Sequence, residues 1–593
     1  MNKARKKRNK DGFATRLVSE SFVLSLTRKL SQRFVRFFEY GIASPILNSA
    51  KSVDSFLRKK ITGPIFKKLD LRENFSMPAR NAIASFFVHN PIMKAASAIQ
   101  TGFLNTSVRS VGVFLLTFAV YSAALFMLKS YVSVGFGSAA SINDISVAAV
   151  ALLIGLLFIA FGDKTLLNTV GNSKIIGSLL SSCLGVNDSS FARYKNSTPK
   201  TAVAVAFLCG SALGIATLFF TPLSVLVCLA AALTVVAIMN VAEFGLLLAM
   251  STFSFLPLNA TVLICTVTLL SYLLKCVRLK RNLRFGTADA VVLLALAAVF
   301  VGCLVTDGGL VGGEYYILCF TALYFVAKNL LCSEKLVTQA FDALCLGASV
   351  GMALYIFGDF ATLIPHGYLR EAAVLLTCCR LEPEMLVAVV ATLLPFALSS
   401  FSSVGNRKPR EFFLLSVAVC AVLTDSSAFY LLALVSLFVY VAFAYKAPFG
   451  SLLGAAAVIP PVAVYTFEHT VSRSVRLGTA LSYDSSLVGS QGMESGSLWY
   501  AMYNIGGGVA VLLFFAAIVL ILQRLLGVGV GESGTKRSLF IGTAASSAVM
   551  FTVCSFSFNL FYDLRIYAVM IFVLGLCGAV YKTVSVAKRA EEV

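Results

Sequence analysis

Four arginines stand out because they lie in two long polar stretches between apolar runs, Gly358–Glu384 and Glu468–Leu498. They are Arg370, Arg380, Arg473 and Arg476. A guanidinium group keeps its charge at physiological pH and binds phosphate oxygens through two parallel hydrogen bonds. The arginines therefore suit a pyrophosphate-linked substrate, although salt bridges to acidic residues of the same stretches explain them equally well.

Three further side chains could take part in proton transfer near these arginines. His366 and His469 each lie in one of the two stretches, and a histidine in a cleft can act as general base on a sugar hydroxyl. A single histidine at the end of an apolar run more often forms an interfacial hydrogen bond. Asp425 lies in a short turn between apolar runs, where a carboxylate is costly unless it faces a cavity or a partner.

Neither a metal nor another cofactor is expected from the motifs. The sequence has no CxxC pair and no Cys/His cluster with the spacing of a zinc site. It also lacks a Walker sequence, a GxSxG motif and an HExxH motif, which argues against an ATPase, a serine hydrolase and a zinc protease.

The elements that position these residues must lie in a membrane. Of 593 residues, 58% are hydrophobic and 13% are charged, whereas a soluble globular chain has about 25% charged residues. Such a chain cannot cover its apolar surface in water, and hydrocarbon accepts that surface without penalty. The composition excludes an ordinary cytosolic enzyme.

Hydropathy predicts an all-α, polytopic integral membrane protein with about 12–16 transmembrane helices. The stretch Phe244–Leu274 is too long for one span and is interrupted by Pro257, which predicts two short helices. The other predicted spans are Val111–Leu128, Ile145–Phe161, Thr201–Phe220, Leu223–Met239, Ala288–Val305, Tyr315–Leu331, Leu336–Phe357, Met385–Phe401, Phe412–Thr424, Ala428–Tyr445, Ser451–Phe467, Trp499–Leu522, Leu539–Phe558 and Leu564–Val580.

The distribution of lysine and arginine predicts the orientation of these spans. Short cytoplasmic loops retain basic residues, and every second connection in this chain is basic, from the one with Lys164 and Lys174 to the one with Arg524, Lys536 and Arg537. We therefore expect a multi-pass protein of the cell membrane with both termini in the cytoplasm. The two arginine-containing stretches then face outward.

The N-terminal residues 1–109 carry most of the net charge of +21, with 21 Lys or Arg and 6 Asp or Glu. Their apolar residues recur at helical spacing among the basic ones, which predicts amphipathic cytoplasmic helices on the membrane surface. Anionic membrane lipids are the expected partner, and nucleic acid is not; packing on another protein is the alternative. Residues 110–582 form the predicted transmembrane domain, and residues 583–593 form a cytoplasmic tail.

Two motifs in the distal half resemble the O-antigen ligase and polymerase family. The first is Leu393–Leu398, followed by a basic turn, Leu423–Ala428 and a long apolar helix. The second is Ser497–Tyr500, followed by Asn504–Gly508 and the aromatic pair at Phe514. The glycines of Asn504–Gly508 predict either close helix packing or a local break of the helix. The resemblance covers about residues 315–580. This sequence differs from the family in having serine at position 427, where arginine is usual, and at position 497, where the ligases have histidine.

The resemblance implies a surface-polysaccharide polymerase or ligase that transfers glycan from an undecaprenyl-pyrophosphate-type lipid to an acceptor at the outer face, without nucleotide or metal. Arg370, Arg380, Arg473 and Arg476 would then bind the donor, with His469 and Asp425 as the catalytic candidates. Other polysaccharide-assembly proteins are further expected partners. A transporter or flippase for lipid-linked glycan or a small solute remains open, as does an inactive scaffold, which the serines at 427 and 497 suggest.

Overall fold

A computed structural model describes the helical body of the chain. The described ranges are 106–131, 142–160, 202–277, 285–306, 313–362, 383–402, 408–423, 427–445, 448–470, 497–529, 536–561 and 563–592, with position 381 and a few single positions between 52 and 184. The predicted amphipathic helices of residues 1–109 lie almost entirely outside these ranges.

Throughout the described ranges the regular structure is helical, with 16 α-helices, one short 3-10 helix and no strand. A helix satisfies its own backbone hydrogen bonds, which is what hydrocarbon requires of a membrane-crossing segment. The α-helices are α9 (Val108–Tyr131), α10 (Ile142–Ala160), α14 (Ala202–Ala216), α15 (Pro222–Asn240), α16 (Ala242–Thr252), α17 (Leu258–Val277), α18 (Thr287–Thr306), α19 (Gly313–Leu330), α20 (Glu334–Thr362), α22 (Pro383–Leu398), α23 (Lys408–Leu423), α24 (Ser427–Ala444), α25 (Pro448–Thr470), α26 (Leu498–Gly529), α27 (Lys536–Ser557) and α28 (Leu564–Glu592).

The chain is an all-α, polytopic membrane protein. Seven of the described helices are long and apolar enough to cross a bilayer on their own, namely α9, α15, α17, α20, α26, α27 and α28. Each of the other predicted spans also coincides with a described helix. The predicted interruption near Pro257 is confirmed, because α16 ends at Thr252 and α17 begins at Leu258.

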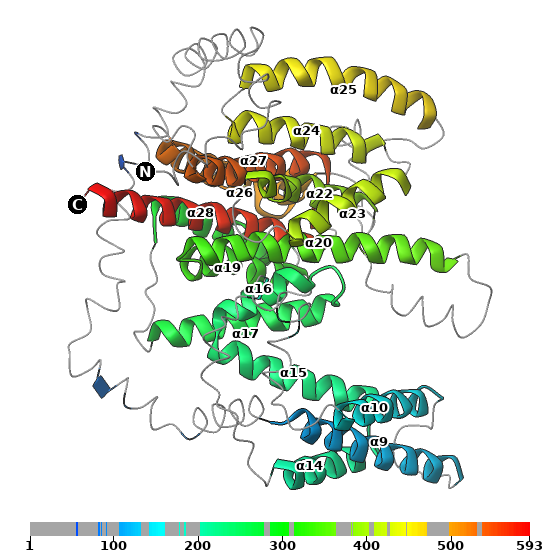
Figure 1. Ribbon diagram of the computed structural model, residues 1–593. Coiled ribbons are helices and arrows are strands. Elements are labelled where there is room, and N and C mark those ends of the chain that lie inside the picture. The colour runs from blue at the N-terminus through cyan, green and yellow to red at the C-terminus, as the bar shows by residue number, and fades with distance from the viewer. Residues whose placement is uncertain are drawn as a thin grey trace, which may run out of the picture. The chain divides into compact units, whose positions relative to one another are not determined.

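The described helices fall into two compact units (Figure 1). The smaller unit comprises Phe75–Leu248 and Val267–Arg281. Glycines bring α10 and α14 against α9 there: a Cβ on Gly155 would lie 2.9 Å from the backbone nitrogen of Leu116, and one on Gly210 would overlap the hydroxyl of Thr117. Small residues at helix crossings allow this close backbone approach, which is the usual means of helix association in lipid.

The larger unit contains Ala249–Thr266 and Asn282–Val593. Its α28 is the most enclosed of the long spans, with 83% of its apolar window buried, whereas α26 has 33% buried. Figure 1 shows α28 beside α19 and α27 within this unit. Serine hydroxyls join its helices where backbones approach, since Ser436 donates to the carbonyl of Ala391 and Ser547 donates to that of Thr392.

Basic residues of the larger unit gather at one end of its helices, which we name the basic end. At this end α18, α20, α23 and α27 begin, and α19, α22, α24 and α26 end. Contacts between these helix ends show that they lie together: Lys328 with Asp289, Arg524 with Thr287, and Phe341 with Phe540. The C-terminal part of α28 also lies at this end, because a Cβ on its Gly578 would contact Lys328. The basic residues of these helices at this end are Lys328, Lys335, Lys408, Arg410, Arg524, Lys536, Arg537 and Lys582. This segregation agrees with the alternation of basic connections seen in the sequence.

Candidate functional site

The structure does not test the predicted site residues by their geometry. Position 469 belongs to the last turn of α25, and the side chain of His469 is not described. The remaining candidates lie outside the described residues, and they are Arg370, Arg380, Asp425, Arg473 and Arg476. The site is therefore built from the described helices of the larger unit.

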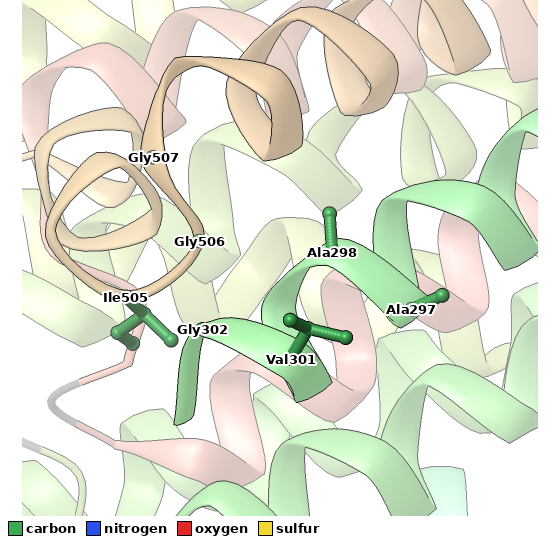
Figure 2. Close-up of a pocket in the computed structure, with 7 residues that line it drawn as sticks. All are labelled: Ala297, Ala298, Val301, Gly302, Ile505, Gly506 and Gly507. Atoms are coloured by element: carbon green, nitrogen blue, oxygen red, sulfur yellow. The ribbon is translucent and has the colours of Figure 1, made fainter. Parts of the chain in front are cut away.

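An apolar cleft lies between α18 and α26. It has a volume of about 530 Å³ and is lined by Ala297, Ala298, Val301, Gly302, Ile505, Gly506 and Gly507. Figure 2 shows the glycine turn of α26 facing Ala298 and Gly302 of α18. The side chains that line the cleft carry no polar group, so the cleft fits a hydrocarbon chain better than a polar head.

Glycines position the two walls of this cleft. A Cβ on Gly302 would lie 1.8 Å from the carbonyl oxygen of Ile505, and one on Gly506 would lie 3.2 Å from Cα of Val299. No real side chain tolerates the first separation, so α18 and α26 can approach this closely only because position 302 is glycine. The sequence interpretation of Asn504–Gly508 as a site of close packing is confirmed here.

A break in α26 gives the cleft its shape. Gly507 has φ 67° and ψ −175°, which is a conformation that only glycine adopts readily, and it interrupts the helix between Leu498 and Gly529. A Cβ at position 507 would meet nothing within 4 Å, so open space lies beside the break. A local break at this position was the other prediction for the glycine run, and it is also confirmed.

The cleft opens toward the face of the helices that would contact lipid. Leu294 and Val301 of α18 are exposed, as are Val509 and Leu512 of α26, with Leu512 71% exposed. Large apolar side chains exposed on membrane-spanning helices contact acyl chains and need no protein partner. A lipid chain can therefore enter the cleft sideways from the bilayer.

The break lies near the end of α26 that is opposite to the basic end. There Ser497 acts as the N-cap of α26, because its hydroxyl oxygen accepts a hydrogen bond of 3.2 Å from the backbone N–H of Tyr500. The backbone N–H of Leu498 donates to the carbonyl of Phe558 at 3.1 Å. Ser497 thus starts and anchors the broken helix.

Trp499, the single tryptophan of the chain, fixes the same helix end. Its indole N–H donates to the hydroxyl of Ser555 at 2.8 Å, and its ring stacks on Phe556 at 5.2 Å between centroids. Phe514 and Phe515 contact the ring from within α26. The aromatic pair of the second motif therefore packs onto Trp499, which joins the two parts of α26 on either side of Gly507.

One arginine at this opposite end escaped the sequence analysis, which had placed it inside a span. Arg565 donates from Nη2 to Asp563 at 2.7 Å and from Nε at 3.0 Å, and its Nη1 donates to the carbonyl of Leu256 at 3.4 Å. Asp563 also accepts from the backbone N–H of Arg565 at the start of α28. Counting arginines within the first two residues of a span would have found it.

A second ion pair is fully enclosed near the basic end. Arg410 of α23 donates to Asp342 of α20 at 2.7 Å and to the hydroxyl of Ser399 at 2.9 Å, and its guanidinium lies 5.7 Å from the ring centroid of Phe341. Arg410 is 0% exposed and the side chain of Asp342 is 3% exposed. The signal in the sequence was the aspartate within a predicted span, which needs a partner in hydrocarbon.

Among the described residues, no three histidine, cysteine, aspartate or glutamate side chains group as a metal site would require. The arrangement therefore offers an apolar cleft at a broken helix, a braced aromatic helix end and a charged residue pair at the same end. Searches for related proteins found no family, no curated protein and no solved structure that matches the chain.

Proposed function

We propose that the protein is a membrane transferase that takes a glycan from an undecaprenyl-pyrophosphate-type lipid and passes it to an acceptor at the outer face. In this reaction an acceptor hydroxyl attacks the anomeric carbon, the bond to the pyrophosphate breaks, and the hydroxyl proton passes to a base. His469 is the proposed base, and Asp425 is proposed to assist it. Arg370, Arg380, Arg473 and Arg476 are proposed to hold the pyrophosphate, whose charge grows as it leaves.

The observation that carries the proposal is the cleft between α18 and α26. A lipid-linked donor needs a hydrocarbon-lined groove that is reached from within the bilayer, and the cleft has an apolar lining and opens toward the lipid-facing surface. The cleft lies nearer to the helix ends that adjoin the two arginine-containing stretches. The first stretch follows the end of α20 at Thr362, and the second precedes the start of α26 at Leu498. Donor chain and donor pyrophosphate would then be bound close to one another along the membrane normal.

The test is transfer by the purified protein in nanodiscs that contain a lipid-linked oligosaccharide. Arg473→Ala and Arg476→Ala should each lower turnover at least tenfold, because an arginine that stabilises the leaving group acts mainly in the transition state. Ala297→Phe should fill the cleft and raise the donor concentration needed for half-maximal rate. Ala456→Phe is the matched control, because Ala456 is an exposed residue of α25.

Unchanged turnover in both arginine variants would discard the assignment of the pyrophosphate site. Equal effects of Ala297→Phe and Ala456→Phe would show that the cleft does not hold the donor chain. If the wild-type protein transfers glycan from none of the lipid-linked donors, the result would favour the alternative that the protein is a catalytically inactive scaffold.

A flippase is the second candidate, because the helix breaks at Pro257 and Gly507 are features that transporters place at their binding sites. It predicts that a fluorescent lipid-linked glycan crosses the bilayer without being transferred. Movement of the donor without any product would support this candidate over the transferase.

A further inference from the structure

The chain bends sharply at the break in α26. In a straight helix the positions of Trp499 and Phe514 would lie about 22 Å apart along the axis, at 1.5 Å per residue. Their ring centroids are 5.8 Å apart, and the rings of Trp499 and Phe515 are equally close. The bend lies at Gly507, where Figure 2 shows the chain turning. α26 therefore consists of two helices, and we name its first part, Leu498–Gly506, the short helix.

The short helix lies at the membrane boundary away from the basic end. From Gly508 to Gly529 the second part of α26 is about 33 Å long, which by itself crosses the hydrocarbon of a bilayer, about 30 Å thick. The short helix is joined to α27 at its first residue and to α18 at Ile505. Ile505 and Gly506 also line the cleft. The short helix thus forms a bridge between α27 and α18 beside the cleft.

The two faces of the short helix differ in polarity. Leu498, Trp499 and Met502 are buried. Tyr503 is 57% exposed, and Asn504 is exposed as well. A polar side chain is costly within hydrocarbon, so the exposed asparagine agrees with a place at the membrane boundary. The buried face holds the short helix in position and leaves the tyrosine and the asparagine accessible.

Both accessible side chains lie next to the cleft. A Cβ on Gly508 would lie 4.0 Å from Cε2 of Tyr503, so the tyrosine ring lies beside the glycine turn. Asn504 directly precedes Ile505, which is part of the cleft lining. A molecule whose hydrocarbon chain occupies the cleft would therefore have these two side chains near its head.

A tyrosine beside an asparagine suits a sugar. A pyranose ring has an apolar face of C–H groups, which packs on an aromatic ring, and a tyrosine offers both such a ring and a polar hydroxyl. The hydroxyls at the edge of the sugar both donate and accept hydrogen bonds, as does a primary amide. Neither side chain is an anion or a cation at neutral pH, which fits a sugar better than a phosphate.

We propose that Tyr503 and Asn504 bind the sugar that the donor lipid carries next to its pyrophosphate. The inference rests on the proposed function, since it needs the donor chain in the cleft between α18 and α26. With the chain in the cleft, the tyrosine ring packs on one face of the sugar and the asparagine amide bonds to its hydroxyls.

The test measures binding without transfer, by native mass spectrometry of the full-length protein in detergent. The probes are undecaprenyl pyrophosphate and the same lipid carrying N-acetylglucosamine or galactose. The wild type should bind at least one sugar-bearing lipid about tenfold more tightly than the sugar-free lipid, because a ring contact and a hydrogen bond are added. Tyr503→Ala and Asn504→Ala should each lower this preference about fivefold.

Binding of the sugar-free lipid should be unchanged in both variants, which shows that they are folded. Tyr503→Phe keeps the ring and should retain most of the preference. Tyr131→Ala is the matched control, because it removes an exposed tyrosine at the end of α9, in the smaller unit. It should leave the affinity for every probe unchanged.

A wild type that binds the sugar-free and both sugar-bearing lipids equally would overturn the sugar site, as would equal losses in Tyr131→Ala and Tyr503→Ala. The transfer assay distinguishes this failure from failure of the proposed function. A preference for the sugar that Tyr503→Ala abolishes, without any transfer, would support the site and refute the transferase. Transfer by a protein whose preference is unaffected by Tyr503→Ala and Asn504→Ala would refute the site alone.

Discussion

The buried pair of Arg410 and Asp342 allows a quantitative test of the packing of the larger unit. Arg410→Met removes the cation and leaves the Asp342 carboxylate enclosed beside Phe341. Breaking a buried ion pair by removing one partner costs about 3–5 kcal/mol, because the remaining charge is uncompensated. Asp342→Leu should destabilise the protein to a similar degree, since it removes the carboxylate that accepts from Nε of Arg410.

The double variant Arg410→Met with Asp342→Leu should recover most of the loss. Replacing both partners with apolar residues of similar volume is often neutral or stabilising. If each single variant loses about 3–5 kcal/mol and the double variant loses about 1 kcal/mol, the coupling free energy is about 5 kcal/mol or more, above the usual range for contacting residues. The measurement is the free energy of unfolding in mixed micelles as the fraction of denaturing detergent increases.

The pair of Arg565 and Asp563 is the internal comparison. Its side chains are 12% and 14% exposed and lie at the end of a helix, so they lose less hydration than the enclosed pair and their coupling should be smaller. Additive losses in the Arg410 and Asp342 variants, with no recovery in the double variant, would refute the reasoning. Equal coupling in both pairs would show that burial does not set the magnitude.

Two further perturbations test the glycine contact and the cap of α26. Gly302→Ala should separate α18 from α26 and lower the unfolding temperature, because its Cβ would overlap the carbonyl oxygen of Ile505. Gly527→Ala is the control and should have little effect, because a Cβ there would meet nothing within 4 Å. Equal shifts of the unfolding temperature in both variants would contradict the packing argument. Ser497→Ala should cost about 1 kcal/mol through loss of the N-cap bond to Tyr500, measured by the fluorescence of the single tryptophan, whereas Ser497→Asp should retain stability.

Much of the fold could be predicted because hydrocarbon imposes simple requirements on a chain. Long apolar runs predicted the helices one by one, and Pro257 predicted the gap between α16 and α17. The glycine run at Asn504–Gly508 predicted close packing or a break, and the structure shows both. Its role as a wall of a lipid-accessible cleft could not be predicted, because the opposite wall comes from α18, some 200 residues earlier in the chain.

The charged residues show the same division between local and tertiary information. Their spacing along the chain predicted that lysine and arginine collect at alternate helix ends, and the larger unit shows this segregation. Pairing was invisible in the sequence, because Asp289 meets Lys328 across 39 positions and Asp342 meets Arg410 across 68. The sequence analysis did not recognise that Arg565 lies at the end of a span. Hydropathy is averaged over a window of residues, and the average hides a single charge at the edge of the window.

By itself, the sequence determined that this is an all-α membrane protein with a basic N-terminal segment and polar stretches rich in arginine. Those properties follow from the amino-acid composition and from the spacing of apolar and basic residues, which can be read from residues close together in the chain. Only the tertiary structure decided that Gly302 meets Ile505, that Ser497 caps a helix broken at Gly507, and that Asp289 pairs with Lys328 at the basic end. Each of these depends on which helices pack together, and in lipid that choice is made by small residues and buried polar contacts distributed over the whole chain.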